Sequence, residues 1–246
     1  MCTVVILRRP EHAWPVLLAA NRDEMADRPW LPPGRHWPDQ PWARAGLDQL
    51  ANGSWMGVND TGVVAAILNR MGTLGPQAGK RSRGELVLEA LDHHDAVDAA
   101  EALQALDGRS YRPFNMVIAD NRDAFWLRAD GSAAVRAFPI PAGLHMISAL
   151  DLDDPASARI ARYAPRFAAA AVPQPDQNDW TGWISLLADG GDGALDEESP
   201  AMCFRRPNGF GTVSSTLLAL PAMGRDCPPH WLFSSQPPGA DTFMHL

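Results

Sequence analysis

The sequence predicts an α+β fold that contains two mostly antiparallel sheets. The β-rich runs arrive in adjacent pairs, the helical runs also arrive in pairs, and the order is strands, helices, strands, helices, strands. Each antiparallel sheet has a face that must be covered, and a pair of helices can cover it. We therefore expect a four-layer αββα sandwich, with a helix pair outside each sheet.

Composition limits the classes of protein to which the chain can belong. Its 246 residues suit one domain over residues 1–246, and 46% hydrophobic residues are enough for a full core. A formal net charge of -8 argues against sequence-independent nucleic-acid binding, which needs a basic surface. No apolar run reaches the roughly 18 residues of a membrane span. The start of the chain lacks the pattern of a secretory signal, and three cysteines without C-x-x-C spacing favour a reduced, cytoplasmic setting.

The first predicted element is a β-hairpin. Apolar runs at residues 3–7 and 14–20 flank a polar break at residues 8–12, a pattern typical of two antiparallel strands and their turn. A turn near residues 11–12 pairs residues whose numbers sum to about 23, with paired Cα atoms about 5 Å apart. This register places Cys2 beside Asn21 and Arg22.

The residues at this position carry a candidate catalytic chemistry. Removal of Met1 would leave Cys2 with a free α-amine of pKa about 8, which can act as the base for its thiol. Arg22 would favour the thiolate, and Asp23 can orient the amine or the guanidinium, next to Asn21. These are the parts of an N-terminal-nucleophile hydrolase. The alternative is a small buried cysteine that opens one strand and a surface ion pair that closes the next.

Residues 28–44 interleave five prolines with three tryptophans. Prolines at this density exclude a helix or a central strand, so we expect an irregular flap. The flap either covers a sheet edge or forms the apolar wall of a pocket. A second hairpin follows, with strands at residues 52–58 and 63–68 around the turn signal Asn59-Asp60-Thr61-Gly62.

A helix with a cationic loop before it is the next prediction. Ser82 and Glu85 have the spacing of a capping box ahead of an apolar run. Lys80, Arg81 and Arg83 then precede the helix N-terminus, where free N–H groups and the helix dipole favour an anion. The loop is either solvated or a site for a carboxylate or phosphate of a ligand.

Two polar clusters resemble metal sites without matching one. Asp92-His93-His94-Asp95 lies between two predicted helices, and adjacent residues on one loop rarely converge on a single ion. The second cluster, residues 151–155, lacks the spacing of a calcium-binding loop. Asp154 and Pro155 fit the N-cap and first position of a helix. We therefore expect no metal.

The remaining elements complete the predicted order. A meander of three strands returns the chain to β structure, and a helix pair and two strands follow it. The expected strands are residues 114–119, 124–127, 133–138, 143–150, 211–220 and 231–234, the expected helices are residues 96–106, 157–171 and 180–188, and residues 189–200 form an acidic loop.

The chain resembles the transport and Golgi organisation protein 2 family, also called the NRDE family after its tetrapeptide. The resemblance covers most of the chain and rests on several short motifs taken together. They are Met1-Cys2-Thr3, Asn21-Arg22-Asp23-Glu24, Asn52-Gly53-Ser54-Trp55-x-Gly57-Val58-Asn59, Leu68-Asn69-Arg70, Ser82-Arg83-Gly84, Phe114-Asn115 and Gly211-Thr212-x-Ser214-Ser215-Thr216.

The resemblance implies the N-terminal-nucleophile hydrolase fold, related to the bile-salt hydrolase and penicillin acylase group. In that group a cysteine attacks an amide, assisted by an arginine and an aspartate near the end of the second strand. The matching positions are Cys2, Arg22 and Asp23, although the hydrolases separate their arginine and aspartate by two residues.

Two further positions depart from the pattern that the resemblance implies. Ser148-Ala149 stands where related chains carry Ser-Asn, and Val213 stands where an arginine is frequent. Loss of an oxyanion donor costs on the order of 3 kcal/mol of transition-state stabilisation. Asn52 and Asn69 are candidate replacements for this donor.

The resemblance also implies an alternative, a non-catalytic protein that binds or moves haem, lipid or acyl-CoA. Such a ligand could lie among Trp30, Trp37, Trp42 and Trp55, with its carboxylates on Arg22 or Arg83. The first hypothesis is a cytoplasmic amidohydrolase that needs no cofactor and acts on a small amide with an apolar acyl part. The candidate catalytic residues are Cys2, Arg22, Asp23 and Asn21, and the candidate ligand-binding residues are Trp55, Asn52, Asn69 and Arg83.

Overall fold

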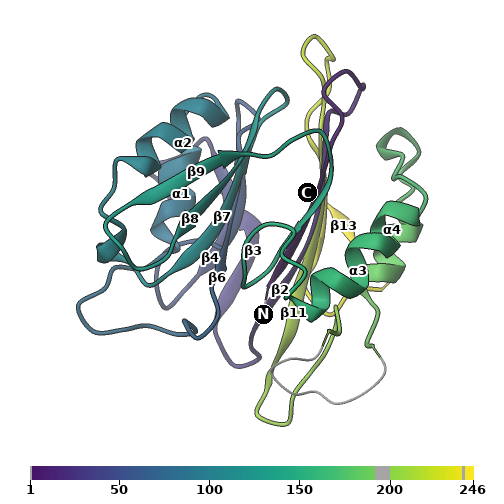
Figure 1. Cartoon of the computed structure of the whole chain (residues 1–246). Coiled ribbons are helices and arrows are strands. Elements are labelled where there is room, and N and C mark those ends of the chain that lie inside the picture. The colour runs from purple at the N-terminus through teal and green to yellow at the C-terminus, as the bar shows by residue number, and fades with distance from the viewer. Residues whose placement is uncertain (1, 192–199, 240–241) are drawn as a thin grey trace. The chain divides into compact units, whose positions relative to one another are not determined.

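The computed structural model describes residues 2–191, 200–239 and 242–246. The chain divides into two compact units. The first unit combines the residues up to Arg28 with those from Ala142 onward, and the second is the continuous segment Pro29–Pro141. In Figure 1 the purple start of the chain and its green-to-yellow end make up the first unit. The expectation of one domain over residues 1–246 stays a prediction.

Six described strands form the antiparallel sheet of the first unit, in the order β10-β1-β2-β11-β12-β13. β1 and β2 are the hairpin at the start of the chain, and β10 and β11 pair with its two sides. Both faces of these central strands are buried, which explains why they read as continuous apolar runs. The strands are β1 (Thr3–Arg8), β2 (Val16–Met25), β10 (Gly143–Ile147), β11 (Phe210–Leu220), β12 (His230–Ser234) and β13 (Met244–His245).

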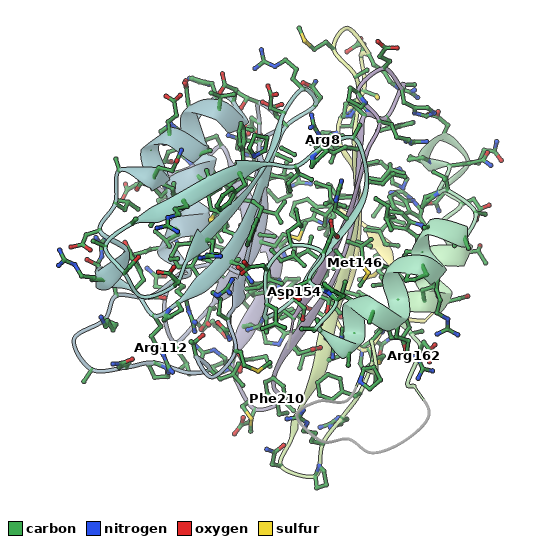
Figure 2. The ribbon with its side chains drawn as sticks, viewed as in Figure 1. Arg8, Arg112, Met146, Asp154, Arg162 and Phe210 are labelled. Atoms are coloured by element: carbon green, nitrogen blue, oxygen red, sulfur yellow. The ribbon has the colours of Figure 1, made fainter. Side chains whose placement is uncertain are left out.

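The helices α3 (Ala158–Ala169) and α4 (Thr181–Leu187) pack on one face of this first sheet. Ser157 caps α3 by accepting a hydrogen bond from the Ile160 N–H. In Figure 2, Met146 of β10 lies beside α3. The core of the first unit joins odd-numbered residues of β1, β2 and β11 to side chains of both helices. The strand residues include Val5, Leu17, Ala19 and Leu217, and the helix residues include Ile160, Tyr163, Phe167 and Trp183.

Seven described strands form the antiparallel sheet of the second unit, and they follow one another in chain order from β3 to β9. The sheet is a continuous meander, interrupted after β6 by the helices α1 (Glu85–Leu91) and α2 (Ala96–Gln104). The strands are β3 (Trp30–Gly34), β4 (Ala43–Asp48), β5 (Met56–Asn59), β6 (Val64–Asn69), β7 (Phe114–Ala119), β8 (Ala124–Ala129) and β9 (Val135–Pro139).

The helices α1 and α2 cover one face of the second sheet (Figure 1). Their buried Leu86, Leu91 and Leu103 belong to the same core cluster as Phe114 and Met116 of β7. Gly57 of β5 permits this close packing, because a Cβ atom there would lie 2.7 Å from Leu91 Cδ1 and 2.4 Å from the Ala45 Cβ. Within the described ranges, no helix is both long and apolar enough to cross a membrane.

The predicted order of elements is confirmed: both sheets are antiparallel and each carries a pair of helices. The tetrapeptide 21–24 lies inside β2 rather than after it, because β11 extends the ladder to the pair Phe210–Met25. Residues 28–44 are not an irregular flap, since they contain the edge strand β3, where Pro32 and Pro33 are tolerated.

The predicted helix starts were wrong in detail. α1 begins after Gly84, which has no side-chain cap, and the Ser82 hydroxyl accepts a hydrogen bond from the Gly84 N–H instead. α3 begins after Ser157 and not after Asp154. The short strand β13 was not predicted, because two residues carry no periodic signal. Most of the predicted acidic loop, residues 192–199, lies outside the described residues.

Candidate active site

The β1–β2 hairpin brings Cys2 next to Arg22. Its register pairs Thr3 with Asn21, a shift of one residue from the predicted register. One step further along the ladder, Cys2 stands opposite Arg22, as neighbouring residues of antiparallel strands do. The predicted proximity of Cys2 and Arg22 agrees with this register extended by one residue, the predicted pairing of Cys2 with Asn21 does not, and the catalytic roles stay predictions.

The four candidate catalytic residues divide between the two faces of the first sheet. Asn21 and Asp23 point toward the helices, because the Asn21 amide bonds Leu187 of α4 and the Asp23 carboxylate bonds Arg159 of α3. Side chains alternate along a strand, so Arg22 points to the opposite face. Thr3 also bonds Arg159, which puts the neighbouring Cys2 on the face of Arg22.

The Cys2 sulfur contacts the backbone of Asp23. Its Sγ lies 3.4 Å from the Asp23 N–H, which donates to it, and 3.5 Å from the Asp23 carbonyl oxygen. Burial raises the pKa of the Cys2 thiol, and the negative charge of Asp23 raises it further, whereas the Asp23 N–H and Arg22 lower it. Burial and the charge of Asp23 therefore oppose ionisation of the thiol, while the Asp23 N–H and Arg22 favour it.

The Asp23 carboxylate is fully buried in a polar cluster. Its Oδ2 accepts a hydrogen bond from Arg159 at 3.2 Å and its Oδ1 accepts one from Thr212 at 2.8 Å. The Arg159 and Asp23 side chains are 7% and 0% exposed. A buried carboxylate needs such partners, because a buried charge without compensation is very costly.

Arg159 and Thr212 were missed as candidate site residues. A signal for Arg159 exists in the sequence: it lies four residues before Tyr163, on the apolar stripe that Ile160, Tyr163 and Phe167 define along α3. A charged residue on such a stripe needs a buried partner. Thr212 carried no separate signal, since its bond to Asp23 joins residues far apart in the chain.

Asn21 makes hydrogen bonds with each part of its amide. Its Nδ2 donates to the carbonyl oxygens of Leu187 and Met202 at 3.0 and 2.9 Å, and its Oδ1 accepts from the Ser215 hydroxyl at 2.6 Å. The residue is 1% exposed. Its amide ties the end of α4 and the segment before β11 to the sheet.

The Arg22 side chain is only 6% exposed, and its Nη2 lies 3.9 Å from the Glu24 carboxylate. Across the next ladder it pairs with Ser214, beyond an irregularity at Val213. The Ser214 hydroxyl is buried and makes no hydrogen bond among the described residues.

The Ser148 hydroxyl donates to the Cys2 carbonyl oxygen at 3.1 Å. Ala149, the next residue in the chain, is buried.

The four candidate ligand-binding residues gather at one end of the sheet of the second unit. The Trp55 carbonyl accepts from Ile67 of β6, two residues before Asn69, and Asn69 pairs with Phe114. Arg83 donates to the carbonyl of Pro113, next to Phe114. The pairing of β6 with β7 and the bond from Arg83 to Pro113 thus bring together residues that are far apart in the chain.

Asn52 and Trp55 have local roles in this arrangement. Asn52 is exposed and has a left-handed backbone, with φ of 52°, in the turn that leads to β5, a conformation that asparagine adopts more readily than most residues. Its carbonyl accepts from the Trp37 indole at 3.2 Å. The Trp55 ring meets Trp30 edge to face at 5.6 Å. The role of these residues in ligand binding stays a prediction.

The three cations of the loop before α1 have partners within the protein. Lys80 bonds the carbonyl of Arg109, Arg81 pairs with Glu85 at 2.6 Å, and Arg83 bonds Thr73 and Pro113. Each cation is directed to an acceptor of the protein. The N-terminus of α1 has no side-chain cap, and the choice between a solvated loop and an anion site stays a prediction.

The described residues contain no group of three or more histidine, cysteine, aspartate or glutamate side chains arranged to hold a metal ion. Asp95 caps α2 by accepting from the Asp98 N–H, and Asp92 accepts from Gln40 and Trp42. In the second polar cluster, Asp153 accepts from the ring of His145 at 2.6 Å. These carboxylates act as caps and tethers in the structure.

Comparison with known proteins shows the family of this chain. The family described as Transport and Golgi organisation 2 matches residues 1–224. The chain belongs to this family. Transport and Golgi organization protein 2 homologs of Bos taurus and Homo sapiens are 33% and 34% identical over 116 and 117 residues. These matches cover 45% of this chain and 40% of each homolog, so they span less than half of either relative.

Solved structures resemble this family member over nearly its whole length. An N-acylethanolamine-hydrolyzing acid amidase ortholog of Caenorhabditis elegans has a TM-score of 0.56 at 13% identity and covers 91% of this chain and 94% of its own. A variant of the conjugated bile acid hydrolase of Clostridium perfringens also scores 0.56, at 12% identity, over 100% and 92%. Penicillin V acylase of Agrobacterium tumefaciens scores 0.51 at 13% identity, over 96% and 83%. The predicted fold class, an α+β fold of the N-terminal-nucleophile hydrolase type, is confirmed.

Proposed function

We propose that this protein hydrolyses a small amide with an apolar acyl part and that Cys2 is the nucleophile. The observation that carries the proposal is the position of the Cys2 sulfur, opposite Arg22 and 3.4 Å from the Asp23 N–H. The fold is shared with amidases and acylases, although a fold alone does not fix a function. A cytoplasmic location stays a prediction.

The proposed reaction requires removal of Met1. The freed α-amine of Cys2, with a pKa of about 8, takes the thiol proton. The sulfur attacks the amide carbonyl carbon and a C–S bond forms, while the carbonyl oxygen becomes an oxyanion. The C–N bond then breaks, and the leaving amine takes the proton from the α-amine. Water hydrolyses the resulting thioester, which releases the acid and regenerates the thiol.

Arg22 and Asp23 have different proposed roles in this reaction. Arg22 shares the face of Cys2 and stabilises negative charge on the sulfur and on the oxyanion. Asp23 acts through its peptide N–H, which donates to the sulfur, while its carboxylate points to α3. Asn21 supports the hairpin from the helix side of the sheet. Trp55, Asn52, Asn69 and Arg83 stay predicted ligand contacts.

An apolar acyl part is favoured by the side chains around the thiol. On the face of Cys2, the nearest even-numbered pair of β1 and β2 is Val4 with Ala20 and the next is Ile6 with Leu18, and all four residues are apolar. A hydrocarbon chain is the ligand chemistry that such a surface stabilises.

The test measures hydrolysis of a panel of N-acyl amides whose acyl chains differ in length, with product acids detected by mass spectrometry. We expect Cys2→Ala to lower the rate on the order of a thousand-fold or more, and Cys227→Ala to leave it unchanged. Intact mass reports the state of the N-terminus in the same preparation. Retention of Met1 in active protein, or full activity of Cys2→Ala, would falsify the proposal.

A second candidate function is ligand binding without catalysis. It is favoured by the raised pKa of the Cys2 thiol, which follows from burial and from Asp23, and by Ala149, which stands where the family resemblance leads us to expect an asparagine. Titration with hemin and with acyl-CoA, followed by tryptophan fluorescence, tests it. We expect saturable quenching at micromolar ligand that survives Cys2→Ala and weakens in Trp55→Ala. Unsaturable or absent quenching rules this candidate out.

A further inference from the structure

Arg159 joins three separate segments in the interior of the first unit. It lies in the first turn of α3 and is 6% exposed. Its guanidinium donates to the Thr3 hydroxyl at 2.8 Å and to the Asp23 carboxylate at 3.2 Å. The Phe204 ring lies 5.5 Å from the guanidinium carbon. One cation thus meets β1, β2 and the segment before β11.

Asp23 connects this cation to the thiol. Its carboxylate meets Arg159 on the helix side of the sheet, and its peptide N–H meets the Cys2 sulfur at 3.4 Å. The negative charge of Asp23 opposes ionisation of Cys2. A cation 3.2 Å from that carboxylate opposes its field at the sulfur, because the two charges have opposite signs.

We propose that Arg159 is a positioning residue that controls the reactivity of Cys2 by neutralising Asp23. The inference rests on the proposed function in taking Cys2 as the reacting group. Arg22 lowers the pKa of the thiol directly, and it lies on the opposite face of the sheet from Arg159. Thr3 and Thr212 hold the ion pair in place from the two sides.

Cys203 provides an independent reporter of the same ion pair. Burial raises the pKa of its thiol, Asp23 raises it further, and Arg159 lowers it. Cys227 lies elsewhere, with its sulfur bonded by the Arg225 side chain at 3.3 Å. The three cysteines of the chain therefore supply two reporters and one internal control in a single digest.

The experiment measures the rate of iodoacetamide alkylation at each cysteine against pH in the full chain, by peptide mapping. Arg159→Met removes the cation beside the Asp23 carboxylate, and we expect it to slow alkylation of Cys2 several-fold at pH 7, because the charge of Asp23 opposes ionisation of the thiol. Asp23→Asn should accelerate alkylation. The double variant removes both charges and should return to within about three-fold of wild type.

Controls separate charge from packing. Arg159→Lys keeps the charge and should stay near wild type, and Arg162→Met removes a cation from the same helix outside its buried face, so it should change nothing. Alkylation of Cys227 should be constant throughout. If Asp23→Asn slows alkylation of Cys2 or leaves it unchanged, the proposal is wrong. This variant tests the proposal even if Arg159→Met does not fold.

The outcomes for the two proposals are distinct. If the charge variants shift alkylation as expected while no amide is hydrolysed, the proposed hydrolase function fails and the role of Arg159 stands. If amides are hydrolysed but the alkylation profile is the same in all variants, the role of Arg159 fails and the hydrolase function stands.

Discussion

At the scale of single residues, two buried asparagines perform the same task in the two units. Asn21 Nδ2 donates to the carbonyls of Leu187 and Met202, and Asn59 Nδ2 donates to those of Leu91 and His93 at 2.9 and 2.7 Å. Leu187 and Leu91 are the last residues of α4 and α1. The last carbonyls of a helix have no partner within it, so each asparagine satisfies a helix end and fastens it to a strand.

Replacement of Asn21 by alanine should destabilise the protein by about 1–3 kcal/mol, because it leaves buried carbonyls without a donor. Denaturant unfolding measures the change, and Asn59→Ala should behave alike. The control is Gln104→Ala, which removes an exposed amide at the end of α2 and should cost less than about 0.5 kcal/mol. A cost for Asn21→Ala no larger than that of the control would contradict the tether.

At the scale of elements, the edge of the first sheet carries a pair of histidines. His230 of β12 stacks on Trp180 at 5.9 Å and meets the ring of His245, on β13, edge to face at 4.8 Å. β13 is held by two register pairs and by the Leu246 N–H to Trp231 carbonyl bond at 3.0 Å. Burial lowers the pKa of His230 and the charge of His245 lowers it further, while Asp176 raises it.

This depressed pKa predicts acid sensitivity of stability. As the pH falls, the unfolded chain binds a proton at His230 near pH 6.5, whereas the folded chain binds it only at a lower pH. The stability that the neutral His230 contributes is therefore complete above about pH 6.5 and is lost as the pH falls below that value. Unfolding free energies at pH 7.5 and 5.5 should therefore differ less in His230→Phe than in wild type. His94→Gln changes an exposed histidine and should keep the full difference. Equal acid losses in wild type and His230→Phe would contradict this origin.

Elements with long periodic patterns were predictable, and contacts between distant segments were not. The hairpins and the meander follow from local runs and turns, and the pairing of Cys2 with Arg22 follows from one short turn. The partners of Asp23 could not be predicted, because Arg159 and Thr212 are 136 and 189 residues away. The faces of Asn21 and Asp23 depend on where α3 and α4 pack, which periodicity alone does not decide.

At the scale of the whole molecule, each unit has a core of its own. Leu91 belongs to the core of the second unit and Leu187 to that of the first, and both are fully buried. Each closes the last turn of a helix and offers its carbonyl to a tethering asparagine. The two leucines are therefore matched probes of the two cores.

Leu91→Ala should cost about 2–5 kcal/mol through the cavity that it leaves. Hydrogen exchange should show the loss of protection mainly in residues of the second unit, and Leu187→Ala should show it mainly in the first. A uniform loss across the chain in both variants would mean that the two cores unfold together.

The first sheet is interrupted in the chain by the whole second unit, since β2 ends before it and β10 and β11 come after it. During translation, at about 5–20 residues per second, the ribosome must finish the continuous second unit before the outer neighbours of the hairpin exist. For that interval the Cys2 carbonyl oxygen lacks its donor Ser148, and Arg22 lacks its register partner Ser214 on β11. The residues around the candidate thiol are therefore assembled in two stages, and the second stage begins only after β9, the last strand of the second unit, has been made.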